Sequence, residues 1–325
     1  MNILSKYVRP VNPETDKELP VYSHSKIEQY LNCPFAYNLK YNEEKKSTDT
    51  SLALELGSLL HKLLEIKGKW IHDGIKVDET KLFEIMEDGY HDESEHLRGI
   101  KELKKSYLED WYAHNPNNIA ERNYEEKIEL FRLVLHNEMR DSEWEPVYFE
   151  LPFEFVWNNR CIIHGYIDRV DVRNGDYKVI DYKTNKKVFE DSKVKTSQQF
   201  SIYACAMLAM FGKLPIEFEY DFILLDKRQQ ALSKGWEKRF IKKLENSLDK
   251  IDESNRTNIF TPRPCPLCYW CSYSQTNPNS KEYKYECDYY SLWTPADKSF
   301  KKNKEYNASE YLKNKLNNGR RKIFF

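Results

Sequence analysis

The sequence contains no run of 18 apolar residues, and this absence argues against a membrane-spanning helix. It also lacks the GxxxxGK[ST] phosphate-binding motif, so we expect no ATP-driven motor within it. The first residues, MNILSKYVRPVNPE, have no apolar stretch like that of a secretion signal, and we therefore expect a cytoplasmic protein. The 51 Lys and Arg residues balance 52 Asp and Glu residues, so any binding of nucleic acid must depend on local positive charge.

Cysteines are few and unevenly placed. Four of them crowd into residues 265–287, which in a reducing compartment indicates metal or iron–sulfur ligation rather than disulfide bonds. The seven are Cys33, Cys161, Cys205, Cys265, Cys268, Cys271 and Cys287. We interpret Cys161, in an expected strand, and Cys205, in an apolar helix, as small core residues.

Hydrophobic periodicity predicts both helices and strands. The expected helices cover residues 23–31, 51–68, 197–211 and 236–251, the second ending at Gly68, and residues 70–143 are expected to form a helical insert. The expected strands cover residues 148–157, 161–172, 177–183 and 217–226. This mixture predicts an α/β fold.

The dipeptide Asn174-Gly175 lies between two β-rich runs and predicts a two-residue hairpin turn. In that register Asp168 faces Asp181, and Tyr166 faces Lys183. Because side chains alternate along a strand, Asp181 and Lys183 share one face. The hairpin therefore brings Asp168, Asp181 and Lys183 into one patch, unless a bulge shifts the register.

Two carboxylates held this close repel each other, so a positive charge is needed to balance them. A divalent cation supplies that charge, and oxygen ligands suit Mg²⁺ or Mn²⁺. The alternative is a surface hairpin with solvated charges, but the run Val179-Ile180 is apolar up to the carboxylate, as in an inner strand.

At these residues the chain resembles the RecB-type branch of the PD-(D/E)xK nuclease superfamily. The resemblance rests on several motifs in the family's order. They are Gly57 and His61 in GSLLH, Asp168 in GYIDRVD, Asp181-Tyr182-Lys183, and Gln199 and Tyr203 in QQFSIY. It implies a restriction-endonuclease-like core, with a central mixed β-sheet flanked by helices.

The resemblance also implies the roles of the site residues. His61, Asp168, Asp181 and the backbone carbonyl after Asp181 would hold one or two divalent ions. Lys183 would orient or deprotonate the attacking water, or stabilise the charged phosphorus centre. Gln199 and Tyr203, four residues apart on one helical face, would donate hydrogen bonds to phosphate or base edges.

Two neighbouring groups of charges are assigned lesser roles. Glu150 and Glu154 are expected to be structural or supporting residues. Lysines around the hairpin, Lys178 among them, are expected to hold phosphates.

AddB-type nucleases and CRISPR-associated RecB-like exonucleases carry one cysteine before the nuclease core and three after it, which together bind a 4Fe–4S cluster. By resemblance, Cys33 is the upstream ligand, and Cys268, Cys271 and Cys287 are the downstream ligands. Cys265 could replace Cys287, and zinc is the alternative metal.

The resemblance divides the chain into five regions. They are the N-terminal segment with the first cluster cysteine (1–50), the helical region with His61 (51–143), the nuclease core (144–235), the C-terminal helix and cysteine cluster (236–290), and a basic tail (291–325).

We therefore expect a Mg²⁺- or Mn²⁺-dependent DNA exonuclease of recombination, repair or phage genome processing. Its substrate would be DNA that is single-stranded or has free ends, and a helicase or recombination protein would be its partner. The alternatives are a catalytically silent DNA-binding or assembly subunit and a zinc-stapled endonuclease. A restriction endonuclease would share the D-x-K core, but the cysteines argue against it.

Overall fold

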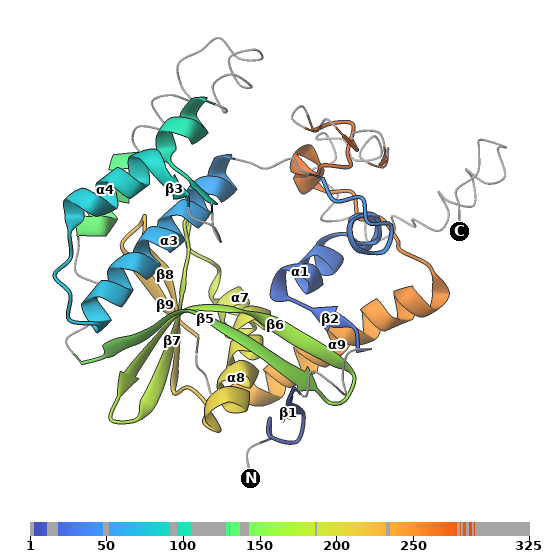
Figure 1. Ribbon diagram of the computed structural model, residues 1–325. Coiled ribbons are helices and arrows are strands. Elements are labelled where there is room, and N and C mark those ends of the chain that lie inside the picture. Colours follow the sequence, from blue (N-terminus) through green and yellow to red (C-terminus); the bar gives the residue numbers. More distant parts are fainter. Residues whose placement is uncertain are drawn as a thin grey trace. The chain divides into compact units, whose positions relative to one another are not determined.

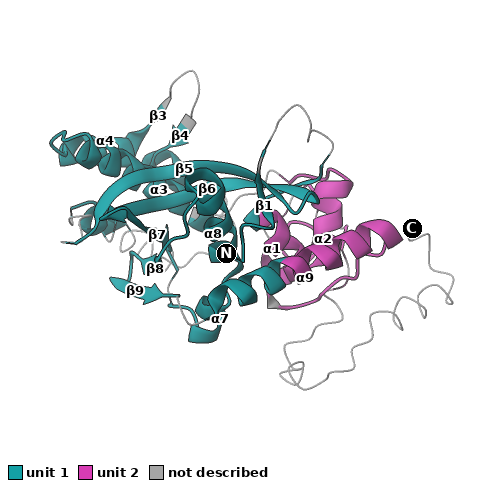
Figure 2. Cartoon of the chain, turned by 90° about the horizontal axis from the view of Figure 1, so that it is seen from below, with its two compact units in different colours: residues 1–24, 50–244 teal, residues 25–49, 245–325 magenta. Residues whose placement is uncertain are grey.

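The computed structural model describes most of the chain. The described residues are 3–11, 19–47, 52–91, 96–105, 128–129, 131–136, 143–185, 187–231, 235–277, 280, 282–283, 286–287 and 289. The chain forms two compact units, Met1–His24 with Thr50–Leu244, and Ser25–Asp49 with Glu245–Phe325 (Figure 2). The expected basic tail lies outside the described residues. None of the described helices is long and apolar enough to cross a membrane.

Among the described residues of the first unit, seven strands form one mixed sheet (Figure 1). The order β1-β5-β6-β7-β8-β9 is antiparallel except for the parallel pair β7–β8, and β2 runs parallel to β6. The strands are β1 (Val8–Pro10), β2 (Val21–Tyr22), β5 (Glu145–Trp157), β6 (Cys161–Arg173), β7 (Asp176–Tyr182), β8 (Glu217–Phe222) and β9 (Lys227–Gln230). The expected α/β fold with a central mixed sheet is confirmed.

The β6–β7 hairpin has the register predicted from its turn. Arg173 pairs with Asp176, and the ladder continues to Arg169 opposite Ile180. Asn174 and Gly175 both have positive φ, at 51° and 78°, as a tight turn of this kind requires. Asp168 and Asp181 are the next residues along this register.

Two helices cover opposite faces of the sheet (Figure 1). Leucines of α3 (Leu52–His72) pack with Phe149, Ile180 and Tyr182. On the other face, Phe200 of α8 (Gln198–Phe211) stacks on Tyr220 at 4.2 Å between ring centroids. The side chain of Ser197 caps α8 by accepting a hydrogen bond from the backbone N–H of Phe200, and this fixes where the helix begins.

Other elements complete the first unit. They are α4 (Glu79–Asp88), β3 (Gly89–His91), β4 (His96–Arg98), α7 (Asp191–Lys195) and the start of α9 (Trp236–Thr257). Strands β3 and β4 form a two-stranded sheet within the region expected to be a helical insert. That insert remains a prediction for residues 106–127, which lie outside the described part of the chain.

The expected helix end at Gly68 is wrong, because α3 continues to His72. A Cβ atom at Gly68 would overlap the ring of Phe149 on β5. The glycine therefore lets the helix lie close against the sheet, and it does not act as a C-cap. The expected strand 217–226 is also too long, since β8 ends at Phe222 and the chain turns into β9.

Replacing Gly68 with alanine is expected to lower the free energy of unfolding by about 1–2 kcal/mol. Overpacking typically costs about 1–3 kcal/mol, and the better helix propensity of alanine returns at most about 1 kcal/mol. Gly57 on the same helix is the matched control, since its Cβ would meet only Thr184 Oγ1, at 3.4 Å. In urea denaturation Gly57→Ala should be neutral or stabilising, and equal effects of the two variants would contradict this account of Gly68.

The second unit contains short helices and the end of α9. Its elements are α1 (His24–Asn32, from Ser25 on), α2 (Pro34–Tyr37), the π-helix η1 (Asn38–Asn42) and the 3₁₀ helix η2 (Pro266–Trp270). Leu248 and Ile251 of α9 are buried, three residues apart on one helical face. The hydroxyl of Tyr30 donates to the carbonyl of Lys250 at 2.6 Å, which ties α1 to α9.

Candidate functional site

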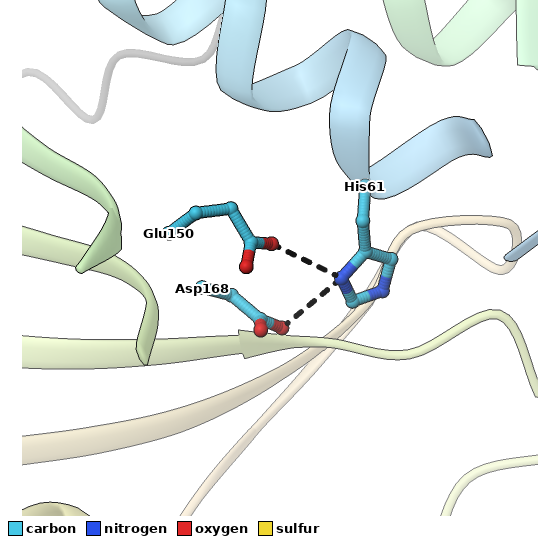
Figure 3. Close-up of side chains that lie close together, drawn as sticks. All are labelled: His61, Glu150 and Asp168. Atoms are coloured by element: carbon cyan, nitrogen blue, oxygen red, sulfur yellow. Dashed lines mark ion pairs between the residues drawn. The ribbon is translucent and has the colours of Figure 1, made fainter. Parts of the chain in front are cut away.

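The imidazole of His61 on α3 lies close to the carboxylates of Glu150 on β5 and Asp168 on β6. His61 Nδ1 lies 3.5 Å from Asp168 Oδ2 and 3.8 Å from Glu150 Oε1 (Figure 3). One potential ligand atom from each residue lies within 4.8 Å of the other two. All three side chains are partly exposed, so the group is accessible and could hold a metal ion.

Glu150 was expected to be a supporting residue, yet its carboxylate belongs to this group. Phe149 pairs with Arg169 and Leu151 pairs with Ile167, so the β5–β6 register places Glu150 opposite Asp168. This register follows from a three-residue connection, because Trp157 pairs with Cys161. A two-residue Asn158-Asn159 turn would have placed Phe149 there, so the loop length is the signal that identifies Glu150.

The backbone at Glu150 is unusual for a strand, with a φ of 46°. Phe149 packs with leucines of α3, whereas Phe153 contacts the ring of Tyr203 on α8 at 6.1 Å, so the alternation of faces breaks between them. Residues other than glycine rarely adopt positive φ, and such conformations persist only where the surrounding structure holds them. The break allows Glu150 to direct its carboxylate toward His61.

Asp181, Lys183, Gln199 and Tyr203 form a closed ring of polar contacts. Lys183 Nζ lies 2.5 Å from Asp181 Oδ2 and donates to Gln199 Oε1 at 3.0 Å. Gln199 Nε2 donates to the hydroxyl of Tyr203 at 3.0 Å. That hydroxyl donates to Asp181 Oδ1, also at 3.0 Å. The ring fixes the rotamers of Asp181 and Lys183 relative to α8.

These contacts refine the expectation for Gln199 and Tyr203. Gln199 accepts a hydrogen bond from Lys183, and Tyr203 donates one to Asp181, so their geometry is that of positioning residues. Lys178, expected near phosphates, is only 2% exposed and pairs with Glu219 at 3.2 Å. It was misplaced because β7 is buried on both faces from Lys178 to Tyr182.

Strand β7 links the group of His61, Glu150 and Asp168 to the polar ring that contains Asp181. The backbone N–H of Tyr182 donates to Asp168 Oδ2 at 2.7 Å, next to Asp181. Asp168 therefore lies between Glu150 of β5 and Asp181 of β7, and three neighbouring strands each contribute one carboxylate. The structure brings together all the sequence-predicted residues of this site and adds Glu150.

Burial and the negative charge of Asp181 raise the pKa of Asp168 to about 7, while the imidazole of His61 opposes that shift. Burial would lower the pKa of His61, but the carboxylates of Asp168, Glu150 and Asp181 raise it above its ordinary value. Burial also raises the pKa of Tyr203 well above the ordinary range, so its hydroxyl remains a donor. Near neutrality the Asp168 carboxyl is thus partly protonated, and a cation bound there would displace that proton.

The residues fit a divalent cation. Asp181 is 1% exposed, and its Oδ2 atom is buried without a hydrogen-bond donor among the described residues, although Lys183 lies beside it as an ion pair. Together with Asp168 and Glu150 it offers carboxylate oxygens, which Mg²⁺ and Mn²⁺ prefer. A bound cation would also relieve the repulsion that raises the pKa of Asp168.

Affinity for Mn²⁺ is expected to fall as pH drops below about 7. The raised pKa of Asp168 means that its carboxyl gains a proton through this range, and a protonated carboxyl or imidazole must lose its proton to bind metal. Each proton displaced weakens binding by up to about tenfold per pH unit. Calorimetric titrations in two buffers of different ionisation enthalpy would measure both affinity and proton release. Constant affinity from pH about 6 to about 8 would contradict the expectation.

A second site lies wholly within the second unit. Cys33, Cys265, Cys268, Cys271 and Cys287 line one cavity of about 330 Å³. Zn–S bonds of about 2.3 Å in a tetrahedron place sulfurs ~3.8 Å apart. Among the described residues, no three of these sulfurs lie within 4.8 Å of one another. In every set of three, at least one pair of sulfurs is therefore farther apart than in a tetrahedral zinc site.

Backbone N–H groups point at the cysteine sulfurs. The N–H of Arg263 donates to Cys33 Sγ at 3.5 Å, and that of Cys265 donates to Cys268 Sγ at 3.4 Å. Cys271 and Cys287 also accept backbone hydrogen bonds. Such bonds stabilise thiolates and tune cluster potentials. As free thiols, Cys268 and Cys287 have pKa values raised to about 12 by burial.

Cys287 is brought to this cavity by backbone pairing. Its N–H donates to the carbonyl of Tyr273 at 2.8 Å, and it forms an isolated bridge with Ser274. The charges of Cys33, Cys271 and Cys268 raise the pKa of its thiol further, after burial. The long gap after Cys271 is therefore compatible with ligation by Cys287.

Comparison with known proteins agrees with this geometry. Residues 21–276 match the PD-(D/E)XK nuclease superfamily, and the chain belongs to that superfamily.

Two kinds of relative are similar to the chain. The Gene 69 protein of Mycobacterium phage D29 is 24% identical over 287 residues, covering 81% of this chain and 98% of the relative. An ATP-dependent helicase/deoxyribonuclease subunit of Clostridium perfringens (strain SM101 / Type A) is 25% identical over 215 residues, covering 58% of this chain. The corresponding subunit of Clostridium botulinum (strain Loch Maree / Type A3) is 26% identical over 279 residues, covering 76% of this chain. The matches span 17% and 23% of the two clostridial proteins.

Proposed function

We propose that this protein is a Mg²⁺- or Mn²⁺-dependent DNA exonuclease that carries a 4Fe–4S cluster. The observation that carries the proposal is the convergence of Glu150, Asp168 and Asp181 from adjacent strands beside Lys183. Membership of the superfamily supports nuclease chemistry. The name of the clostridial relatives, helicase/deoxyribonuclease, supports DNA as the substrate.

His61, Glu150, Asp168 and Asp181 would hold the divalent cation. When bound, the cation acidifies water and neutralises negative charge that develops on the phosphate. The chain's own residues position the reactants around it. In the reaction, water forms a new P–O bond, the bond from phosphorus to the leaving sugar oxygen breaks, and that oxygen takes up a proton.

Lys183 would stabilise the negative charge of the phosphate under attack. Its Nζ atom lies between the Asp181 carboxylate and the Gln199 carbonyl oxygen, a position from which it can donate to a phosphate oxygen. Gln199 and Tyr203 would act through Lys183 and Asp181, because their hydrogen bonds fix both side chains.

The 4Fe–4S cluster would be bound by Cys33, Cys268, Cys271 and Cys287. It would join the segment around α1 to the segment around η2 and contribute to folding rather than to hydrolysis. The cavity, the wide sulfur spacing and the backbone N–H donors support this reading. Cys265 lies beside Cys268 and remains the alternative ligand.

The substrate would be single-stranded DNA or DNA with free ends, in recombination, repair or phage genome processing. A helicase or recombination protein would supply such ends, as the paired activities in the clostridial relatives' name suggest. The similarity to a phage protein along 98% of that protein's length supports a role in phage genome processing just as well.

The test uses protein purified anaerobically and DNA labelled at one end. Linear single-stranded and double-stranded DNA, and circular single-stranded DNA, are incubated with Mg²⁺, with Mn²⁺ or with a chelator. We expect metal-dependent loss of linear DNA only. Cleavage of the circle would overturn the exonuclease assignment, and no cleavage of any form would overturn the nuclease proposal. The visible spectrum and iron content of the same sample test the cluster.

A further inference from the structure

The β5–β6 hairpin extends past the metal-site carboxylates and carries an exposed aromatic side chain. Tyr166 lies two residues before Asp168 on β6 and is 61% exposed. At about 3.3 Å per residue, its Cα lies about 7 Å along the strand from that of Asp168. At this separation a nucleotide whose phosphate is held at the carboxylates could reach the ring.

A shallow, open groove borders this side chain. Its lining residues are Pro152, Phe153, Glu154, His164, Gly165 and Tyr166. Pro152 pairs with Tyr166 across the strands, and Glu154 pairs with His164, so these four share one exposed face. Phe153 and Ile167 are buried on the opposite side, which anchors the hairpin.

Gly165 keeps this part of the hairpin closely packed. A Cβ atom there would lie 2.9 Å from the ring of Phe153, its cross-strand partner. Phe153 in turn contacts Tyr203, the residue that donates to Asp181. The strand that carries Tyr166 is thus held rigidly relative to the metal site.

The charge of the groove selects which part of a nucleotide could occupy it. Glu154 places a carboxylate in the groove, and none of the groove's lining residues is a lysine or arginine. A phosphate would be repelled there, whereas a nucleobase is neutral. Bases stack on aromatic rings without regard to sequence, and Glu154 and His164 offer polar atoms to base edges.

We propose that this groove is a base-binding subsite, in which Tyr166 stacks on an unpaired base beside the phosphate held at the metal site. The inference rests on the proposed function, since it places the strand to be cleaved at Glu150, Asp168 and Asp181. It assigns to the same site a requirement for an unstacked, single-stranded nucleotide. Tyr166 is a positioning residue, because its ring lies off the reacting atoms.

The experiment pairs a protein change with a DNA change. Wild type, Tyr166→Ala and Tyr166→Phe are assayed on linear single strands that carry one abasic nucleotide at successive positions from the end. For wild type, the abasic nucleotide is expected to raise KM about tenfold when it occupies one particular position, because one stacked base is then lost. Tyr166→Ala should show the same loss on intact DNA and no further loss from that abasic nucleotide. Tyr166→Phe, which keeps the ring, should behave as wild type.

A binding measurement separates this inference from the proposed function. A fluorescent base analogue at the sensitive position is titrated with protein in Ca²⁺, and stacking is expected to quench it for wild type and Tyr166→Phe only. Ile75→Ala removes a similarly exposed apolar side chain elsewhere and serves as the control. Wild type and Tyr166→Ala could degrade DNA with the same KM and show the same rise in KM on abasic DNA. That result would overturn the base-binding subsite and leave the proposed function standing. If wild type neither binds nor degrades DNA, both proposals fall.

Discussion

Replacing Asp181 with asparagine is expected to reduce DNA cleavage by at least about 100-fold, the scale on which loss of one electrostatic contact to a transition state acts. The side chain is 1% exposed, bonds to Tyr203 and pairs with Lys183, so the change removes a cation ligand and frees the ammonium together. Without metal, the variant should have a stability close to that of wild type, because loss of the repulsion between Asp168 and Asp181 offsets loss of the ion pair with Lys183.

This combination of effects gives a sharp thermal test. Saturating Mn²⁺ should raise the melting temperature of wild type, since a ligand that binds only the folded state stabilises it by mass action. The same Mn²⁺ should have little effect on Asp181→Asn. Asp176→Asn is the matched control, because Asp176 begins the same strand and pairs with Lys213 at the surface. An active Asp181→Asn protein would remove Asp181 from the proposed mechanism.

Replacing Cys33 with alanine is expected to abolish cluster binding and to give poorly soluble or unstable protein. Cys33 lies between α1 and α2, and it is the one cavity cysteine that precedes the strands β5 to β9 in sequence. Metal-binding free energy in structural sites is largely folding free energy, on the order of 10 kcal/mol where it has been measured for zinc. Iron content and the visible spectrum measure the cluster, and limited proteolysis measures the stability of the second unit.

Three further cysteine variants distinguish ligand loss from a general effect of removing a thiol. Cys265→Ala should keep the iron if Cys287 is the fourth ligand, and Cys287→Ala should lose it. The opposite pattern would reassign the ligand to Cys265. Cys205→Ala, in the core of α8, should keep the iron in either case. Soluble, fully active Cys33→Ala protein with normal proteolytic resistance would contradict the structural role.

How much of the site could be predicted depended on how strongly local sequence fixes backbone geometry. Asn174-Gly175 permits few turns, so its hairpin register, and with it the closeness of Asp168 and Asp181, was predicted correctly. The connection after Trp157 is one residue longer than an Asn-Asn turn, and a shift of one residue changes which side chain faces Asp168. Glu150 was therefore missed. No rule of strand alternation predicts its positive φ either.

Helix α3 shows a second reason why local sequence does not predict every role. Glycine commonly ends helices, and Gly68 was interpreted in that way. Its actual role depends on Phe149, which is far away in sequence and packs where a Cβ atom would lie. The positions of Gln199 and Tyr203 on one helical face were predictable from their spacing. Their hydrogen bonds to Lys183 and Asp181 depend on how α8 packs on the sheet.

The division of the chain has a consequence for its synthesis. The second unit joins Ser25–Asp49 to Glu245–Phe325, and contacts such as that of Cys33 with Arg263 span 230 residues. Contacts so distant in sequence form slowly, because a long loop must close first. During synthesis, Cys33 emerges from the ribosome long before the cysteines of residues 265–287. Insertion of the proposed cluster is therefore expected to be a late step that follows the emergence of Cys287, and slow supply of iron or sulfide would leave a folded sheet with an incomplete second unit.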